Sequence, residues 1–482
     1  MTEEVAVVGK RKVEDRVYKQ SDALDNLCNL QRIFDYAAKS QGVFYTSLSH
    51  AATTAGTVST GVLCMDLLFG GGHMPGRFTY FYGPSGSCKS TMLFHTIREA
   101  TKKDIKVCFI DSEASTDPSY LEKLGIDLDK IKGRRNKKGW ETKPTLLHHF
   151  PHHADGAFDW MFTVLDAMDD KIMLEDPKEG MRYFLVENGH QYSTNWKSIT
   201  DGLKSKKIVE VEEATPQLFL LVDSLRMVTR ATAEDLTNKQ PALLAKALHR
   251  GFSMIKSLLG QKMVNLVATN HLTINPLDKY NKESEPGGEA VKYYPDVKTK
   301  LAVNRFKSRI ITENHVSGDG YDRYSQGKAY IEKNKGGTSH REMEYRIWLD
   351  EQGEPGRGIC PVYDAFQYLT CTNQLELVDE KKGTFKITLT GYDTDVLTYS
   401  EFKTWMLTRE ESKSLKEACL AQFKTGDAQE MYYQYNKTIN IVDMKKKKAK
   451  EKANVLGQAA VVTEGEEDDD RHLEVNEEEV EL

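Results

Sequence analysis

The residues best suited to chemistry form a loop rich in glycine and serine that ends in a lysine. It lies between a stretch that predicts a strand and a stretch that predicts a helix, and it runs Gly83-Pro84-Ser85-Gly86-Ser87-Cys88-Lys89-Ser90-Thr91. In that context the backbone N–H groups of such a loop bind phosphate oxygens. Lys89 can reach the β- and γ-phosphates of a nucleotide, and the Ser90 hydroxyl can bind Mg²⁺. The loop therefore predicts a site for a nucleoside triphosphate and Mg²⁺.

One position of this loop departs from the usual pattern, which has glycine where this chain has Cys88. Cysteine is small, but the loop must accommodate its Cβ atom. The strand before the loop and the helix after it are the context that a phosphate-binding loop requires, so the prediction of a phosphate site stands.

Two acidic residues follow predicted strands. Asp223 ends the apolar run Leu218–Val222, and Glu113 comes just after the apolar run Lys106–Ile110. Ligands of open α/β sheets bind at the carboxyl ends of the strands, so we expect both carboxylates near the phosphate loop. Asp223 would complete the Mg²⁺ shell, and Glu113 would orient an attacking water. Either acid could instead cap a helix, but their combination with the loop favours nucleotide hydrolysis.

Short apolar strands that alternate with helices must position these groups. We expect an α/β fold with a mostly parallel central sheet flanked by helices. Its strands are predicted at Phe78–Gly83, Lys106–Ile110, Leu218–Val222 and Val264–Thr269. A helical N-terminal segment, a strand–turn–strand unit at Tyr330–Asp350 and a small C-terminal α+β unit would surround this core.

The composition excludes several classes of protein. The chain has 482 residues, of which 39% are hydrophobic and 29% charged, which is typical of soluble globular proteins with more than one domain. Its longest apolar run is far shorter than the ~20 residues that span a bilayer. The N-terminus lacks the apolar core of a signal peptide, and seven cysteines occur without a CxxC pair. These features predict a cytoplasmic protein with reduced thiols and no membrane partner.

The negative charge is concentrated at the C-terminus. Residues Glu464–Leu482 contain eleven acidic residues and one arginine, so the net charge of −6 leaves +4 on the rest of the chain. A basic body with an acidic tail suits a protein that binds a polyanion and whose tail competes for the same surface. A tail that only keeps the protein soluble would have the same composition.

The stretch from about residue 131 to 215 is the least regular part of the middle, and we interpret it as an insertion. It contains the sequence HHFPHH, with histidines at 148, 149, 152 and 153, but no carboxylate or cysteine spacing there supports a metal site. The basic run Lys132–Lys138 is more typical of a solvated loop than of a DNA contact.

Several segments in fixed order resemble the RecA-type recombinase family. They are VSTGVLCMDLLFGGGHMPGRFTYFYGPSGSCKST at 58–91, FIDSEASTDPSYLEKLGIDLDKI at 109–131, VDSL at 222–225, ATNH at 268–271, GGEAVKYY at 287–294 and IEKNK at 331–335. The resemblance covers roughly residues 55–350. The ATNH and FIDSE segments and the unusual phosphate loop are most similar to the UvsX-like bacteriophage recombinases.

The resemblance implies ATP with Mg²⁺ as the cofactor and assigns roles to individual residues. Glu113 matches the catalytic glutamate, and Asp117 and Tyr120 match positions that contact adenine. Asn270 and His271 match a polar sensor of the γ-phosphate.

Two lysines and two loops complete the roles that the resemblance implies. Lys333 and Lys335 match lysines that reach the ATP of a neighbouring subunit. Without the resemblance they would be alternate residues of an exposed strand. The DNA-binding loops match Arg226–Asn238 and Pro276–Tyr294. Their candidate DNA contacts are Arg226, Arg230, Gly287, Gly288, Lys292 and Tyr293, and Arg250 on the helix after the first loop is a further candidate. Taken singly, each basic residue would be an ordinary surface charge.

The function implied is ATP-dependent strand exchange. The protein would form a head-to-tail helical filament on single-stranded DNA and pair that strand with duplex DNA, with single-strand-binding and mediator proteins as further partners. We divide the chain into a helical polymerisation segment (1–50), a RecA-type ATPase core (51–355), a C-terminal domain (356–440), and a basic linker with a disordered acidic tail (441–482). If the chain is phage-encoded, it would act in the host cytoplasm.

Two alternatives share this core. A ring helicase would need a helicase-type N-terminal domain, and the matches at Tyr120, Lys333 and Lys335 favour the recombinase. A non-catalytic ATP-binding accessory protein is disfavoured by the presence of Glu113, Lys89 and Asp223, although the departure at Cys88 leaves this alternative open.

Overall fold

The protein is described by a computed structural model that covers much of residues 56–423. The ranges outside the description are 1–55, 137–138, 177–178, 194–195, 213–214, 228–242, 275–282, 304–309, 315–320, 338, 350–357, 380–381, 390–395, 409–414 and 424–482. The expected N-terminal helical segment (1–50) and the acidic tail therefore lie outside the described residues.

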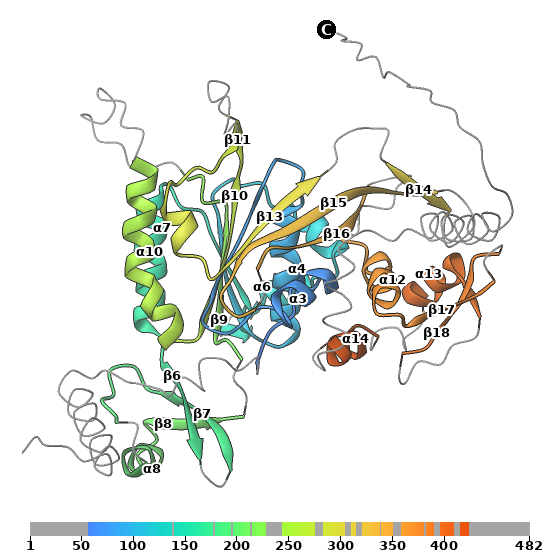
Figure 1. The fold of residues 1–482 in the computed structure, drawn as a ribbon. Coiled ribbons are helices and arrows are strands. Elements are labelled where there is room, and N and C mark those ends of the chain that lie inside the picture. Colours follow the sequence, from blue (N-terminus) through green and yellow to red (C-terminus); the bar gives the residue numbers. More distant parts are fainter. Residues whose placement is uncertain are drawn as a thin grey trace, which may run out of the picture.

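A central sheet of nine described strands organises the fold (Figure 1). Six strands pair in parallel in the order β13-β1-β10-β9-β2-β5, and β14, β15 and β16 extend one edge antiparallel. Their bounds are β1 Phe78–Gly83, β2 Lys106–Asp111, β5 Leu146–His149, β9 Leu218–Asp223, β10 Val264–His271, β13 Val297–Val303, β14 Ile311–Asn314, β15 Tyr321–Asn334 and β16 Arg341–Trp348. The prediction of a mostly parallel sheet is confirmed.

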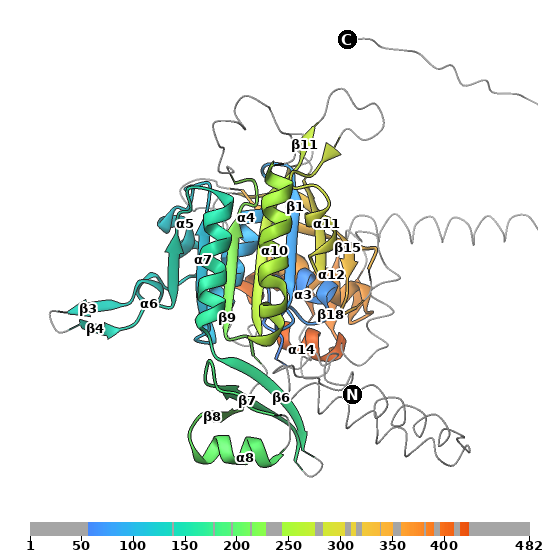
Figure 2. The same cartoon turned by 90° about the vertical axis from the view of Figure 1, so that its left-hand side faces the viewer.

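Helices cover both faces of the sheet because its central strands are apolar on both sides. In β9, Phe219 and Leu221 face the layer of α3 (Leu63–Phe69), α4 (Lys89–Lys102) and α12 (Pro361–Cys371). Leu220 and Val222 face α7 (Ala154–Ala167) and α10 (Leu243–Gln261), which lie side by side in Figure 2. The same alternation in β1 and β2 explains why these strands are continuous apolar runs in the sequence.

Residues 131–215 divide between this core and two appended pieces. Strand β5 extends the sheet beside β2, and α7 packs against α10, so both belong to the core rather than to an insertion. The appended pieces are a hairpin of β3 (Arg134–Asn136) and β4 (Gly139–Thr142), and a subdomain with its own apolar cluster. The subdomain consists of β6 (Asp170–Asp176), β7 (Gly180–Val186), α8 (Trp196–Lys204) and β8 (Ile208–Val211).

The C-terminal unit packs against the antiparallel edge of the sheet, where buried ion pairs and a cation–π contact lie. Lys403 is 2% exposed, and its Nζ lies 2.6 Å from Asp322 Oδ2 on β15. Arg346 of β16 pairs with Glu313 of β14, and its guanidinium lies 4.1 Å from the ring centroid of Tyr363 on α12. Besides α12, the unit comprises β17 (Leu375–Asp379), β18 (Thr384–Ile387), β19 (Leu397–Thr398), α13 (Tyr399–Thr408) and α14 (Leu415–Phe423).

The close approach of α7 and α10 depends on a glycine. A Cβ atom at Gly251 would lie 2.2 Å from the ring of Phe158. We predict that Gly251→Ala lowers the free energy of unfolding by about 1–3 kcal/mol through overpacking. A Cβ atom at Gly260, near the end of the same helix, would have no neighbour within 4 Å, so Gly260→Ala should raise stability by up to about 1 kcal/mol. Denaturant unfolding of the two variants checks this, and equal effects would contradict it.

Candidate nucleotide and DNA sites

The phosphate loop joins β1 to α4 and brings Lys89 to the start of the helix. Lys89 is 5% exposed, and its Nζ donates a hydrogen bond to the Pro84 carbonyl at 2.8 Å. The Ser87 hydroxyl donates to the same carbonyl at 2.8 Å. A Cβ atom at Gly83 would lie 2.1 Å from the Leu301 carbonyl oxygen, so only glycine fits where β1 passes β13. The predicted strand–loop–helix context is confirmed.

Cys88 adopts the left-handed conformation, with φ of +62° and ψ of +29°, at the N-cap of α4. This conformation costs a residue with a Cβ roughly 1–2 kcal/mol, which explains why glycine is usual at this position. The thiol is directed into the apolar cluster below the loop. Burial raises its pKa to about 11, so at neutral pH it is a protonated thiol.

Acidic groups meet at the ends of two neighbouring strands, because β2 and β9 pair in a register that sets Asp111 opposite Asp223. Asp223 is 3% exposed and accepts a hydrogen bond from the Thr269 hydroxyl. Burial raises the pKa of Asp223, hydrogen bonds from Ser90 and Thr269 lower it, and nearby Glu113 and Asp111 raise it. A hydroxyl and a carboxylate in contact are hard oxygen ligands, and the surplus negative charge suits a divalent cation. Ser90 and Asp223 therefore fit Mg²⁺.

Glu113 lies just beyond β2, within reach of this site. Its Oε1 accepts a hydrogen bond from the Ser224 hydroxyl at 2.7 Å and lies 2.8 Å from His271 Nε2. The side chain is 35% exposed, so it is fixed at one oxygen but open to solvent. This is the arrangement that a water-orienting base requires.

Asn270 and His271 diverge, although they were expected to act together. Neighbouring residues of a strand point to opposite faces, and only His271 contacts Glu113. Asn270 is fully buried, and its Nδ2 donates a hydrogen bond at 2.7 Å to the Pro286 carbonyl, in the second of the two expected DNA-binding loops (Pro276–Tyr294, the second loop below). His271 is therefore placed to contact a phosphate, whereas Asn270 links β10 to the loop.

The two predicted adenine contacts lie on α5 (Pro118–Lys123). The Tyr120 hydroxyl lies 3.1 Å from Thr91 Oγ1, and its ring centroid lies 6.0 Å from that of Phe94 on α4. Asp117 caps α5, and its carboxylate accepts a hydrogen bond from the Ser119 N–H at 2.8 Å, which lowers the pKa of Asp117. Tyr120 is thus brought to the phosphate-loop helix, and the contact of Asp117 in this structure is a helix cap.

The two lysines expected to act across an interface are held at the end of the second loop. Lys333 Nζ donates to the Tyr293 carbonyl at 2.8 Å and to the Lys292 carbonyl at 3.2 Å. Lys335 Nζ lies 3.1 Å from Asp296, a carboxylate that is 1% exposed. Burial and neighbouring cations lower the pKa of Lys333. Both lysines are half-buried or exposed at the surface of this chain, on the far side of β1 from Glu113.

The second loop ends in the predicted glycines and α11 (Ala290–Tyr293). Gly287 has φ of +113°, and a Cβ atom there would lie 2.6 Å from Leu248 on α10, so only glycine fits. Gly288 also has a positive φ. Tyr293 is 70% exposed, and exposed Lys292 pairs with Glu289 at 2.7 Å. An exposed aromatic ring beside a cation suits the binding of single-stranded DNA.

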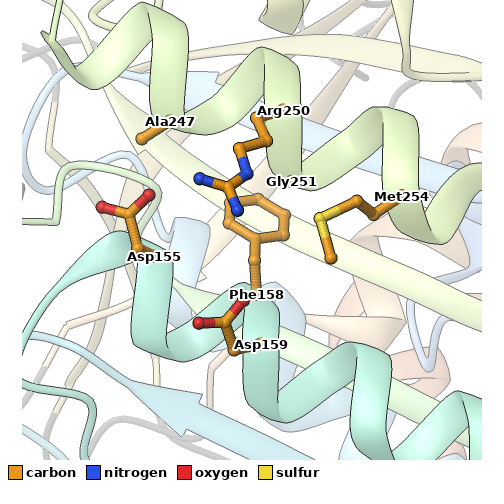
Figure 3. Close-up of a pocket in the computed structure, with 7 residues that line it drawn as sticks. All are labelled: Asp155, Phe158, Asp159, Ala247, Arg250, Gly251 and Met254. Carbon is orange, nitrogen blue, oxygen red and sulfur yellow. The ribbon is translucent and has the colours of Figure 1, made fainter.

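The candidate DNA-binding arginines do not lie together. Arg226 is exposed just after β9, and Arg230 lies outside the described residues. Arg250 extends from α10 into a pocket beside Asp155 and Asp159 of α7 (Figure 3). Leu248 faces Gly287, and Arg250 projects toward α7 instead, so it is not grouped with the second loop.

Three of the four HHFPHH histidines have structural partners. His148 lies 3.4 Å from Asp111 and stacks on Phe109, His149 stacks on Trp160, and His153 caps α7. In the part of the chain that the structure describes, no group of three or more His, Cys, Asp or Glu side chains is arranged to hold a metal.

Sequence reasoning missed Ser224, Thr269 and Asp111, which contact the carboxylates of Glu113 and Asp223 or lie beside them. Asp111 lies two residues before Glu113 and Ser224 directly follows Asp223, a signal that could have found them. Thr269 is recognisable only once β9 and β10 are known to be neighbours.

A parallel sheet with a phosphate loop, two carboxylates and a histidine at one edge defines a P-loop nucleotide hydrolase. The profile of the RecA N-terminal domain matches residues 39–140. Proteins named Protein RecA from Brucella suis, Brucella canis and Brucella abortus are each 37% identical to the chain over 342 residues, covering 70% of this chain and 74% of theirs. The chain belongs to the RecA family, and it is an ATP-dependent recombinase with DNA-dependent ATPase activity. No described helix has the length and apolarity to cross a membrane.

The conformation of Cys88 generates a stability prediction. Cys88→Gly should raise the free energy of unfolding by about 1 kcal/mol, because glycine adopts positive φ without a steric cost. Cys88→Ala is the matched control: it removes the thiol but keeps the Cβ, so it should give no gain. Chemical denaturation of both variants measures the difference. If Ala stabilises as much as Gly, the thiol and not the backbone is the cause.

Proposed function

We propose that ATP with Mg²⁺ binds at the loop 83–91 and that Glu113 activates the water that attacks the γ-phosphate. The observation that carries this assignment is the position of Glu113, which is fixed by Ser224 and His271 at Oε1. The other carboxylate oxygen would accept a hydrogen bond from the attacking water. Mg²⁺ bound by Ser90 and Asp223 would neutralise charge on the phosphates.

The remaining groups of the site hold and sense the nucleotide. Lys89 would exchange its contact with the Pro84 carbonyl for the β- and γ-phosphates, because a charged oxygen is the stronger acceptor. Tyr120 would stack on adenine. His271 would contact the γ-phosphate. Its contact with Glu113 would couple the binding of the γ-phosphate to the orientation of the general base.

We further propose that the active form is a head-to-tail filament on single-stranded DNA, since an interface that does not close generates a helix. Lys333 and Lys335 would cross this interface and stabilise charge on the neighbour's ATP, as an arginine finger does. In the filament, DNA would contact Arg226, Arg230, Lys292 and Tyr293, and Gly287 and Gly288 would serve as the hinge of the second loop. The position of Arg250 beside two acids gives it the weakest support as a DNA contact.

The remaining assignments are proposals on the same basis. The segment 1–50 would mediate polymerisation, 51–355 would be the ATPase core, 356–440 a C-terminal domain and 441–482 a linker with an acidic tail. The ATNH and FIDSE segments support a UvsX-like subtype and a place in the cytoplasm of a phage-infected host. Duplex DNA, single-strand-binding proteins and mediator proteins would be partners during strand exchange.

The role of Glu113 predicts a separation of hydrolysis from assembly. Glu113→Gln should lower DNA-stimulated ATP turnover by about 10²–10⁴-fold, because the amide cannot act as the base. Filaments should still form and should last longer. Turnover and electron microscopy measure the two properties, with Glu122→Gln on exposed α5 as the control. Wild-type turnover in Glu113→Gln would show that another group orients the water.

The two lysines should act in trans. Lys333→Ala/Lys335→Ala should lower turnover at least tenfold while ATP binding by isolated subunits stays nearly unchanged, because these residues would complete only the neighbour's site. Mixing this variant with Glu113→Gln should restore part of the activity, since some mixed interfaces contain every group. Lys328→Ala, on the same strand, is the control. No recovery at any ratio in filaments shown to be mixed would contradict an interfacial site.

A further inference from the structure

One buried lysine on β13 contacts three functional segments at once. Lys298 is 6% exposed, and its Nζ lies 2.7 Å from Glu285 Oε1 and 3.0 Å from Glu332 Oε2. The same ammonium lies 4.7 Å from the ring centroid of Tyr82. Burial removes water from these charges, so their attraction is stronger than that of a surface ion pair.

Each of the three contacts belongs to a different part of the proposed machinery. Glu285 precedes Pro286 and Gly287 at the base of the second loop. Glu332 precedes Lys333 on β15, and Tyr82 precedes the first glycine of the phosphate loop. Lys298 therefore joins the DNA loop, the strand of the interfacial lysines and the strand that leads to the phosphates.

Further hydrogen bonds close this set of residues into a network. The Tyr80 hydroxyl donates to Glu285 Oε2 at 3.2 Å, and the Tyr82 hydroxyl donates to Glu332. Asn270 of the sensor strand donates to the Pro286 carbonyl at 2.7 Å. Two carboxylates share one ammonium, so displacing either carboxylate leaves a buried charge with fewer partners. The loop base and the strand of Lys333 are therefore expected to shift together.

We infer that Lys298 is a positioning residue that couples the second loop to the interfacial lysines. Single-stranded DNA bound to the second loop constrains the position of Glu285. Through Lys298 it also fixes Glu332, and with it the direction of Lys333 and Lys335. This inference rests on the proposed function, because it requires that the loop binds DNA and that the lysines act on ATP.

The test is the ratio of ATP turnover with and without single-stranded DNA. Lys298→Met should reduce this ratio at least tenfold while turnover without DNA changes less than twofold, since the side-chain volume is nearly kept while the ion pairs with Glu285 and Glu332 and the contact with the Tyr82 ring are lost. Lys298→Arg should keep most of the stimulation. Lys300→Met is the matched control, because Lys300 lies on the same strand and pairs with Glu283 at 2.6 Å, a contact to the loop that does not include Glu332.

A double-mutant cycle serves if Lys298→Met fails to fold. Glu285→Gln and Glu332→Gln should each reduce the stimulation, and the double variant should reduce it no further, because either change breaks the same link. Independent effects that multiply would overturn the inference. Full stimulation in Lys298→Met would also overturn it. The same holds if turnover with DNA and turnover without DNA fall by equal factors in Lys298→Met, Glu285→Gln and Glu332→Gln. An unstimulated wild type would instead overturn the proposed function.

Discussion

The parallel pairing of β1, β10, β9 and β2 is the constraint on which the site depends. The register sets Gly83 opposite His271 and Asp111 opposite Asp223, so four strands end along one edge of the sheet. The phosphate loop and Glu113 follow strand ends, and His271 and Asp223 are the last residues of β10 and β9. They converge because the apolar faces of these strands bury against helices on both sides. A slip of register in any pair would separate groups that must act within a few ångströms.

Much of this arrangement could be predicted from the sequence, because it depends on local patterns. The strand–loop–helix around Lys89 and the strand ends before Glu113 and Asp223 are recognisable as short apolar runs followed by polar residues. The position of β5 and α7 in the core could not be predicted, since their sequence lies in an irregular stretch between two appended pieces. Their place is decided by pairing with β2 and packing on α10, contacts that span long distances in the sequence.

The side-chain partners of the site were the least predictable part. Asn270 was expected to share a role with His271, but the alternation of side chains along β10 turns it toward Pro286. The ion pairs of Lys298 with Glu285 and Glu332 join three separate segments, so no local sequence motif indicates them. The left-handed φ of Cys88 is likewise a property of the folded loop, although the usual glycine at this position was a hint of it.

In the proposed function, ATP and DNA are linked through one edge of the sheet. His271 contacts Glu113, the proposed general base, and Asn270 donates a hydrogen bond to the Pro286 carbonyl in the second loop. Lys333 contacts the carbonyls at the end of α11. In the proposed filament, the ATP site of each subunit is completed by its neighbour. Cryo-electron microscopy of the protein with ATP, Mg²⁺ and single-stranded DNA tests this most directly. The account predicts an open helical filament in which Lys333 and Lys335 of one subunit approach the phosphates held by Lys89 of the next. Closed rings, or nucleotides remote from both lysines, would contradict it.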